Sequence, residues 1–258
     1  MKKIQAIISL AIVLCLLLPL SLHLTAATTL YVDNQVIEKT FFQKIIFFFS
    51  SVLNKISGIT GHAIINVGPT ETFTTIQSAI NNASDGDTIN VAAGTYTEIN
   101  IIINKSLTIV GDPGDDSPGP GTNAPVIDGG SNPGDAFKLA NGVSGVTISG
   151  FEIKGFTSSD TGIGNGVSAW VGSTSDIDIQ DNYFHNLGWN GVMVGNDYST
   201  NPTKWGDHTG WTIKNNLLET FEYYGFELTN TNDSTIENNI IHSDLTSNPS
   251  TCIMVDAT

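Results

Sequence analysis

Aromatic and acidic side chains gather in the C-terminal half of this 258-residue chain. Glu219 and Glu227 could orient the hydroxyl groups of a sugar polymer, and aromatic rings could pack on the faces of its pyranose units. The rings in question belong to Trp170, Trp189, Tyr223 and Tyr224. The alternative is that strands favour aromatic and polar side chains on any solvated face. The pattern therefore raises a binding site as a hypothesis.

Three aspartates, Asp176, Asp178 and Asp181, are the closest approach to a calcium site in the sequence. Calcium prefers several carboxylate and carbonyl oxygens. On a strand, residues two positions apart share a face, so the carboxylates of Asp176 and Asp178 could reach one ion. The alternative is a set of solvated surface acids. Calcium is thus the only cofactor that the sequence raises.

The fold is indicated by a fourfold repeat between Val143 and Thr258. Each repeat contains a short alternating stretch that ends in isoleucine, then a two-residue corner, then a second apolar pair. The isoleucines are Ile148, Ile179, Ile213 and Ile236. A repeat that keeps its corners while its loops vary in length predicts a stack of equivalent coils. Successive coils would place their apolar side chains about 4.8 Å apart in a column.

Alternation within each repeat predicts which side chains point into the stack. On the third strand of each repeat, we expect Ser168, Met193, Glu227 and Met254 to point outward. Next to this face, just after the second strand, a further column would hold Lys154, His185, Glu219 and His242. Asn182, Asn216 and Asn239 occupy one corner of successive coils, where asparagine tolerates a left-handed backbone and its amide can bond to the next coil.

The segment before the repeats predicts a start for this stack. Thr74 or Thr75 can cap a short helix that carries Ile76, Ala79 and Ile80, and strands are expected at 88–91, 99–103 and 107–110. Residues 112–135 are rich in Gly, Pro, Asp and Asn, which predicts a long loop with one short strand at Val126 and Ile127. This stretch resembles the entry segment of right-handed parallel β-helix proteins of the pectate-lyase-like superfamily.

The resemblance covers roughly residues 63–258 and implies an all-β solenoid with a short N-terminal capping helix. That superfamily includes lyases, hydrolases, esterases and epimerases, so activity must be tested by motif. Pectinesterases and many pectate lyases depend on an arginine, and this chain has none. The polygalacturonase motifs are incomplete and in the wrong order. Some calcium-dependent lyases use a lysine as the base, and Lys154 or Lys214 could serve.

The N-terminal region indicates export. Residues 1–27 have the order of a signal peptide: two lysines, an apolar run and small residues at the end. The alternative is an uncleaved membrane anchor. Residues 28–62 form an N-terminal segment in which 41–56 predict an amphipathic helix, packed on the fold or on a membrane surface. We therefore expect three parts: the leader, this segment, and a β-helix domain over 63–258.

Charge and cysteine content limit the partners. The formal charge is −15, and because the leader carries two lysines and no acid, the remainder carries −17. A nucleic-acid partner is excluded, since phosphate backbones require cationic contacts. Only Cys252 lies outside the leader, so no internal disulfide is expected.

The sequence favours a secreted or cell-surface β-helix protein that contacts a polysaccharide or cell-wall glycan without catalysis. The alternatives are a calcium-dependent polysaccharide lyase or uronate epimerase, and a purely structural repeat module of an envelope or adhesion protein. Because Thr258 falls at the close of a core-forming strand, we also expect a piece of a longer protein that lacks its C-terminal cap.

Overall fold

The computed structural model describes the strands at 30–32 and 35–37, and residues 62–114, 117–158, 162–170, 172–195, 206–242 and 251–256. The expected signal peptide at 1–27 and amphipathic helix at 41–56 lie outside these residues. The chain divides into two units, Met1–Thr60 and Gly61–Thr258. In the first, β1 (Leu30–Val32) pairs with β2 (Gln35–Ile37) in an antiparallel hairpin. No helix among the described residues is long and apolar enough to cross a membrane.

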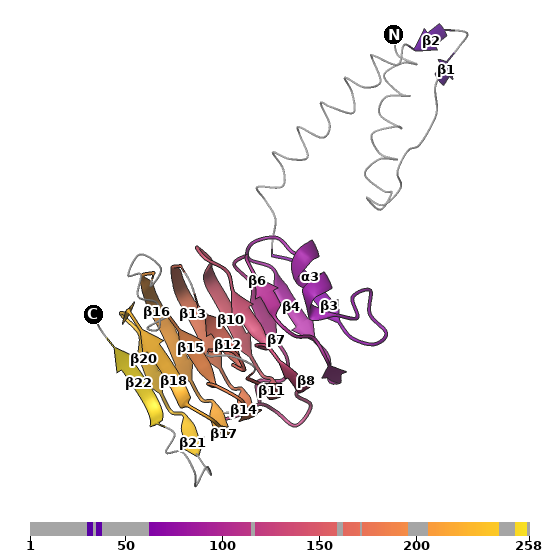
Figure 1. The fold of residues 1–258 in the computed structure, drawn as a ribbon. Helices are drawn as coiled ribbons and strands as arrows, with labels where there is room; N and C mark the ends of the chain where they lie inside the picture. Colours follow the sequence, from indigo (N-terminus) through magenta and orange to yellow (C-terminus); the bar gives the residue numbers. More distant parts are fainter. Residues whose placement is uncertain are drawn as a thin grey trace. The chain divides into compact units, whose positions relative to one another are not determined.

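The second unit is built from three parallel sheets whose strands follow one another around each coil (Figure 1). Sheet 1 contains β3 (Ile64–Val67), β4 (Thr88–Val91), β7 (Thr108–Val110), β10 (Ser144–Ser149), β13 (Thr174–Gln180), β16 (His208–Lys214), β19 (Thr231–Asn232) and β20 (Thr235–Glu237). Sheet 2 contains β5 (Thr95–Tyr96), β8 (Val126–Pro133), β11 (Glu152–Thr157), β14 (Tyr183–Leu187), β17 (Leu217–Phe221) and β21 (Ile240–His242). Sheet 3 contains β6 (Ile101–Ile103), β9 (Phe137–Leu139), β12 (Val167–Ala169), β15 (Val192–Val194), β18 (Tyr224–Thr229) and β22 (Thr251–Asp256).

This architecture is a right-handed parallel β-helix, as the resemblance implied. The four repeat isoleucines lie in register: Ile148 pairs with Ile179, which pairs with Ile213, which pairs with Ile236. The first three of these side chains are fully buried, and Ile236 packs partly buried against the same core. The apolar column inferred from the repeat is therefore confirmed.

The helix α3 (Ile76–Asn82) covers the beginning of the stack and buries Ile76, Ala79 and Ile80. Thr75 is its N-cap and accepts a hydrogen bond from the Ser78 amide. The Glu98 carboxylate accepts the amides of Ile76 and Gln77 at 2.7 and 2.8 Å. At the other end, the Lys105 ammonium donates to the carbonyls of Ile80, Asn81 and Ala83. Both helix ends are thus satisfied by the first coil, which fixes the helix on the stack.

The corner between sheets 1 and 2 carries an asparagine ladder. Asn216 Oδ1 accepts the Asn182 amide at 3.0 Å, and Asn239 Oδ1 accepts the Asn216 amide at 2.8 Å. Asn182 Oδ1 in turn accepts the amide of Phe151. The ladder confirms the prediction that these asparagines are structural.

The sequence predicts the left-handed backbone at the ladder asparagines themselves, but in the structure it falls one residue earlier. Positive φ falls on Gly150, Asp181, Asn215 and Asn238, at 78°, 57°, 55° and 52°, directly before the ladder positions. Gly, Asp and Asn are the residue types that adopt this backbone most readily. The turn and the amide ladder therefore use two consecutive residues of each coil.

A second ladder, which the sequence reasoning missed, runs along the corner between sheets 2 and 3. Asn100 Oδ1 accepts the Asp135 amide, and Asp135 Oδ1 accepts the Asn165 amide at 3.0 Å. Asn165 Oδ1 accepts the Asn190 amide, and Asn190 Oδ1 accepts the Tyr224 amide at 2.9 Å. The signal was present in the sequence as Asn-Gly-Val, twice, directly before a sheet 3 strand.

The glycines in this corner let successive coils approach closely. A Cβ atom on Gly191 would lie 2.6 Å from the Gly225 carbonyl oxygen and 2.4 Å from Leu218 Cδ2. Any larger residue there would push the coils apart.

One further element differs from the expectation: β8 covers Val126–Pro133, so the strand expected within the 112–135 loop is longer than two residues.

Candidate functional site

The outer face of sheet 2 presents a row of ionisable side chains, which we call the polar strip. In register, Lys154 lies beside His185, and His185 beside Glu219. The neighbouring positions place Glu152 beside Tyr183. The polar strip comprises Glu152, Lys154, Tyr183, His185 and Glu219. Three of these five belong to the outward column expected from the repeat.

Hydrogen bonds join the members of the polar strip. Glu152 Oε1 accepts from Lys154 Nζ at 2.9 Å and lies 3.1 Å from His185 Nε2. The His185 ring stacks on that of Tyr183, with centroids 4.3 Å apart. The Tyr183 hydroxyl donates to Glu219 Oε2 at 2.6 Å. The strip is thus a connected network across three coils.

Burial and hydrogen bonding shift the pKa of three members of the network, Tyr183, Lys154 and Glu152. Burial raises the pKa of the Tyr183 phenol to about 12, and the hydrogen bond to the Glu219 carboxylate adds to the rise. The hydrogen bond to Glu152 raises the pKa of Lys154 against a smaller opposing effect of burial. Burial favours neutral Glu152, but the bonds from Lys154 and His185 outweigh it and lower the pKa of that carboxyl.

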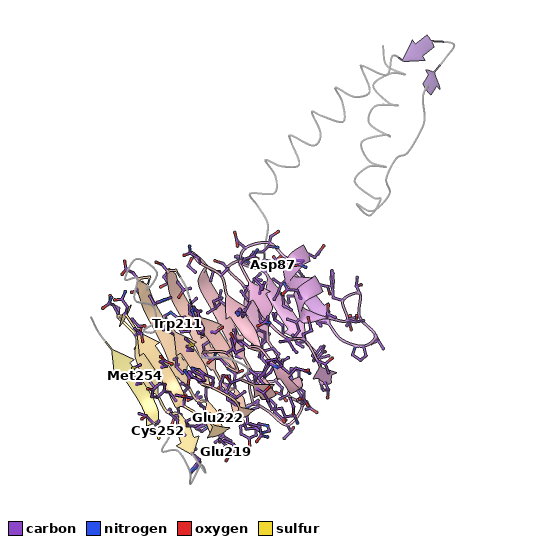
Figure 2. The ribbon with its side chains drawn as sticks, viewed as in Figure 1. Asp87, Trp211, Glu219, Glu222, Cys252 and Met254 are labelled. Carbon is purple, nitrogen blue, oxygen red and sulfur yellow. The ribbon has the colours of Figure 1, made fainter. Side chains whose placement is uncertain are left out.

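A shallow groove of about 180 Å³ lies beyond the polar strip, where the strands of sheet 2 end. We call it the corner groove. It is lined by Phe156, Thr157, Asn186, Leu187, Gly188, Thr220, Phe221 and Glu222. The strands bend into the groove at Gly155, Asn186 and Thr220, which share a left-handed backbone. Figure 2 shows Glu219 of the polar strip and Glu222 of the groove on the same side of the stack.

An aromatic cluster follows the corner groove in the chain. Trp189 comes after Gly188, and Tyr223 comes after Glu222; their rings stack at 3.8 Å. Trp189 is 5% exposed and Tyr223 36% exposed, so the indole supports one side of a ring that is open to solvent. The Tyr224 ring meets Tyr223 edge-on at 6.3 Å. Three of the four predicted aromatic residues are therefore brought together.

Two predicted binding residues lie elsewhere. Glu227 is 1% exposed, and Asn190 Nδ2 donates to its Oε2, so it belongs to the buried corner rather than to an open groove. Trp170 packs over Gly162, where an added Cβ would lie 1.6 Å from Cη2 of the indole.

The structure corrects the expected open column on sheet 3: Ser168, Met193 and Glu227 are buried, and Met254 is partly exposed. Alternation along a strand predicts the direction of a side chain and not what packs against it. The burial of these three side chains was therefore outside what the sequence pattern could predict.

The three aspartates expected to bind calcium do not form a cluster. Asp176 has φ 56°, which breaks the strand alternation on which the prediction rested. Asp181 also takes a left-handed backbone, at the corner. Throughout the described ranges, no three His, Cys, Asp or Glu side chains converge as metal ligands would. These residues as placed do not fit a calcium site.

Comparison with known proteins identifies a family. A family model described as "Protein of unknown function (DUF1565)" matches residues 59–255. No curated protein was found that matches the chain in sequence. Among solved structures, alginate lyase from Paenibacillus sp. str. FPU-7 is 17% identical with a TM-score of 0.42, covering 69% of this chain and 76% of the lyase. Pectin methylesterase from Aspergillus niger is 13% identical with a TM-score of 0.37, covering 77% and 68%. Likenesses this distant assign no activity.

Proposed function

We propose that this chain, which belongs to the DUF1565 family, binds an uncharged polysaccharide along sheet 2. The description of that family assigns no activity. The polymer lies on the polar strip and extends through the corner groove to Tyr223. The observation that carries this proposal is the stack of solvent-exposed Tyr223 on buried Trp189 at the end of the groove.

Tyr223 is suited to a sugar ring because its orientation is already fixed. The Trp189 indole holds the phenol ring in place, so little side-chain entropy is lost when a ligand packs on it. Tyrosine also combines an apolar face with a polar tip. Glu222 and Asn186 lie in the adjacent groove and can accept and donate hydrogen bonds to hydroxyl groups.

Binding without catalysis is supported by the direction of the pKa shifts. A general base or acid works best with a pKa near the working pH. Here the pKa of Lys154 is raised and that of Tyr183 reaches about 12, both away from neutrality. Lys154 is therefore held as a cation by Glu152, which opposes its use as the base of a lyase.

An uncharged ligand is supported by the local charges. Glu152, Glu219 and Glu222 lie on or beside the ligand path, and Lys154 is the one lysine of the polar strip. The remainder of the chain outside the leader is also strongly acidic. A polyanion would be repelled from this face unless a cation bridged it.

The test is a glycan array followed by calorimetric titration of the best neutral ligand, with and without calcium. We expect binding that does not need calcium, weakened about tenfold in Tyr223→Ala, or about 1.4 kcal/mol. Tyr223→Phe keeps the ring and should retain binding. Ile64→Ala removes an exposed apolar side chain on sheet 1 and serves as the control.

The outcomes separate the competing functions. Tyr223→Ala with unchanged affinity would refute the ligand path, and the absence of any glycan ligand would favour a purely structural module. Unsaturated products from a uronate polymer would show a lyase instead. We also propose an extracellular location from the leader-like residues 1–27, which N-terminal sequencing of the protein recovered outside expressing cells would test.

A further inference from the structure

A larger cleft, of about 540 Å³, lies on the outer face of sheet 1, away from the polar strip. Its lining includes outward side chains of β7, β10, β13 and β16, which are neighbours in that sheet (Figure 1). Pro113 and Gly114, from the segment after β7, contribute to the lining as well. A volume of this size is in the range of small-molecule sites, which is roughly 300–1,000 Å³.

The cleft contains a lysine that forms no ion pair with any of the described residues. Four lysines fall within the described ranges. Lys105 caps α3, Lys138 pairs with Asp135 at 3.5 Å, and Lys154 pairs with Glu152 at 2.9 Å. Lys214, the fourth, has no ion pair and no hydrogen-bond acceptor for its ammonium group within the described part of the chain. Because none of the described residues pairs with this ammonium group, it is available to an anion that enters the cleft.

The groups around Lys214 are suited to a sugar. Thr108 and Thr147 lie in register and supply hydroxyl groups about 4.8 Å apart, the strand spacing. Gln180 lies directly beside Lys214 and adds an amide. Asn215 supplies a second amide, and its Oδ1 accepts from Asn238 at 2.6 Å. These groups can bond to ring hydroxyls on either side of a charged substituent.

Acidic residues limit the strength of this site. Asp181 lines the same cleft, and Glu237 is the cross-strand neighbour of Lys214. A ligand held by one ammonium group beside two carboxylates binds weakly, and salt screens the interaction further.

We infer that this cleft binds an anionic saccharide, with the Lys214 ammonium paired to a carboxylate or sulfate group of the sugar. The site lies on another sheet from the polar strip and does not depend on the proposed neutral ligand. A charge-assisted contact of this kind contributes more than a neutral hydrogen bond.

Calorimetric titrations of the full chain at low ionic strength test the inference. The carboxylate probe is an oligogalacturonate, with its methyl ester as the uncharged match; the sulfate probe is a sulfated oligosaccharide of similar length. We expect at least one anionic probe to bind, and the stronger one identifies the anion. Lys214→Gln should weaken binding about tenfold, while Lys214→Arg should preserve it.

The control measurements separate this site from the polar strip. Lys214→Gln should leave thermal unfolding and any neutral-glycan binding unchanged, because the side chain makes no internal bond in the described structure. Equal binding of the acid and its methyl ester would overturn the inference. So would unchanged anion affinity in Lys214→Gln, or no binding of either anionic probe by the unmodified chain. None of these results depends on whether Tyr223 binds a neutral glycan.

Discussion

Replacement of Asn216 by alanine tests how far the asparagine ladder stabilises the stack. Asn216 is fully buried, and its side-chain amide donates to the carbonyls of Ile179 and Lys214, both at 2.9 Å, and to Asn239 Oδ1 at 3.0 Å. Its Oδ1 accepts from the main-chain and side-chain amides of Asn182 at 3.0 and 3.2 Å. Alanine removes all five contacts and provides no replacement.

The expected loss follows from the groups left unsatisfied. The buried Asn182 amide loses its acceptor, and the Ile179 carbonyl loses a donor. Each unsatisfied buried group costs about 1–3 kcal/mol. Allowing for partial relaxation, Asn216→Ala should lower the free energy of unfolding by about 3–5 kcal/mol. That loss is a large share of the free energy of unfolding of an ordinary domain, which is about 5–15 kcal/mol.

Urea unfolding followed by circular dichroism gives the midpoint shift. Asn90→Ala is the matched control, because Asn90 is exposed on a sheet 1 strand and its amide reaches Asn66 Oδ1 only at 3.5 Å. We expect the control to change stability by less than about 0.5 kcal/mol. A loss below about 1 kcal/mol for Asn216→Ala would refute the argument that the ladder amides cannot find other partners.

Two further predictions concern sheet 2. Thr220 is a β-branched residue at φ 55°, whereas the equivalent positions in the two preceding coils are Gly155 and Asn186. Because asparagine adopts this backbone more readily, Thr220→Asn should raise the free energy of unfolding by about 1 kcal/mol, measured by urea unfolding. A lower urea midpoint for the variant would contradict the argument that Thr220 is strained. Because the pKa of Tyr183 rises from 10.0 to about 12, folding favours the protonated phenol, and its contribution is complete below pH 10 and lost as pH rises to about 12. Between pH 10 and about 12, the urea midpoint should fall less for Tyr183→Phe than for the unmodified protein. An equal fall of the midpoint with pH in both proteins would contradict this prediction.

The core and the first ladder could be predicted because they repeat in sequence. Ile148, Ile179 and Ile213 recur at the end of an alternating stretch, and alternation with repetition is enough to place them in one column. A local pattern also predicts the helix N-cap at Thr74 or Thr75, and the structure places it at Thr75. Features that depend on a local or repeated pattern can therefore be predicted from the sequence.

The accessible surface could not be predicted in the same way. Alternation predicts an accessible Glu227, yet this side chain is buried, because exposure also depends on what packs against the strand. Asp176 departs from its strand face through a left-handed backbone that the pattern did not reveal. The sequence predicted only part of the polar strip: it predicted the column that holds Lys154, His185 and Glu219, but not the hydrogen bond from Tyr183 to Glu219.

The asparagine ladder also has a consequence for how this chain can vary. Its rungs join residues separated by 31, 34 and 23 positions, although each rung has nearly the same geometry. Turns of the solenoid can therefore gain or lose about ten residues without disturbing the rungs above and below. Such a chain can acquire new surface loops while its scaffold stays constant, which makes it a natural host for segments transplanted from other proteins.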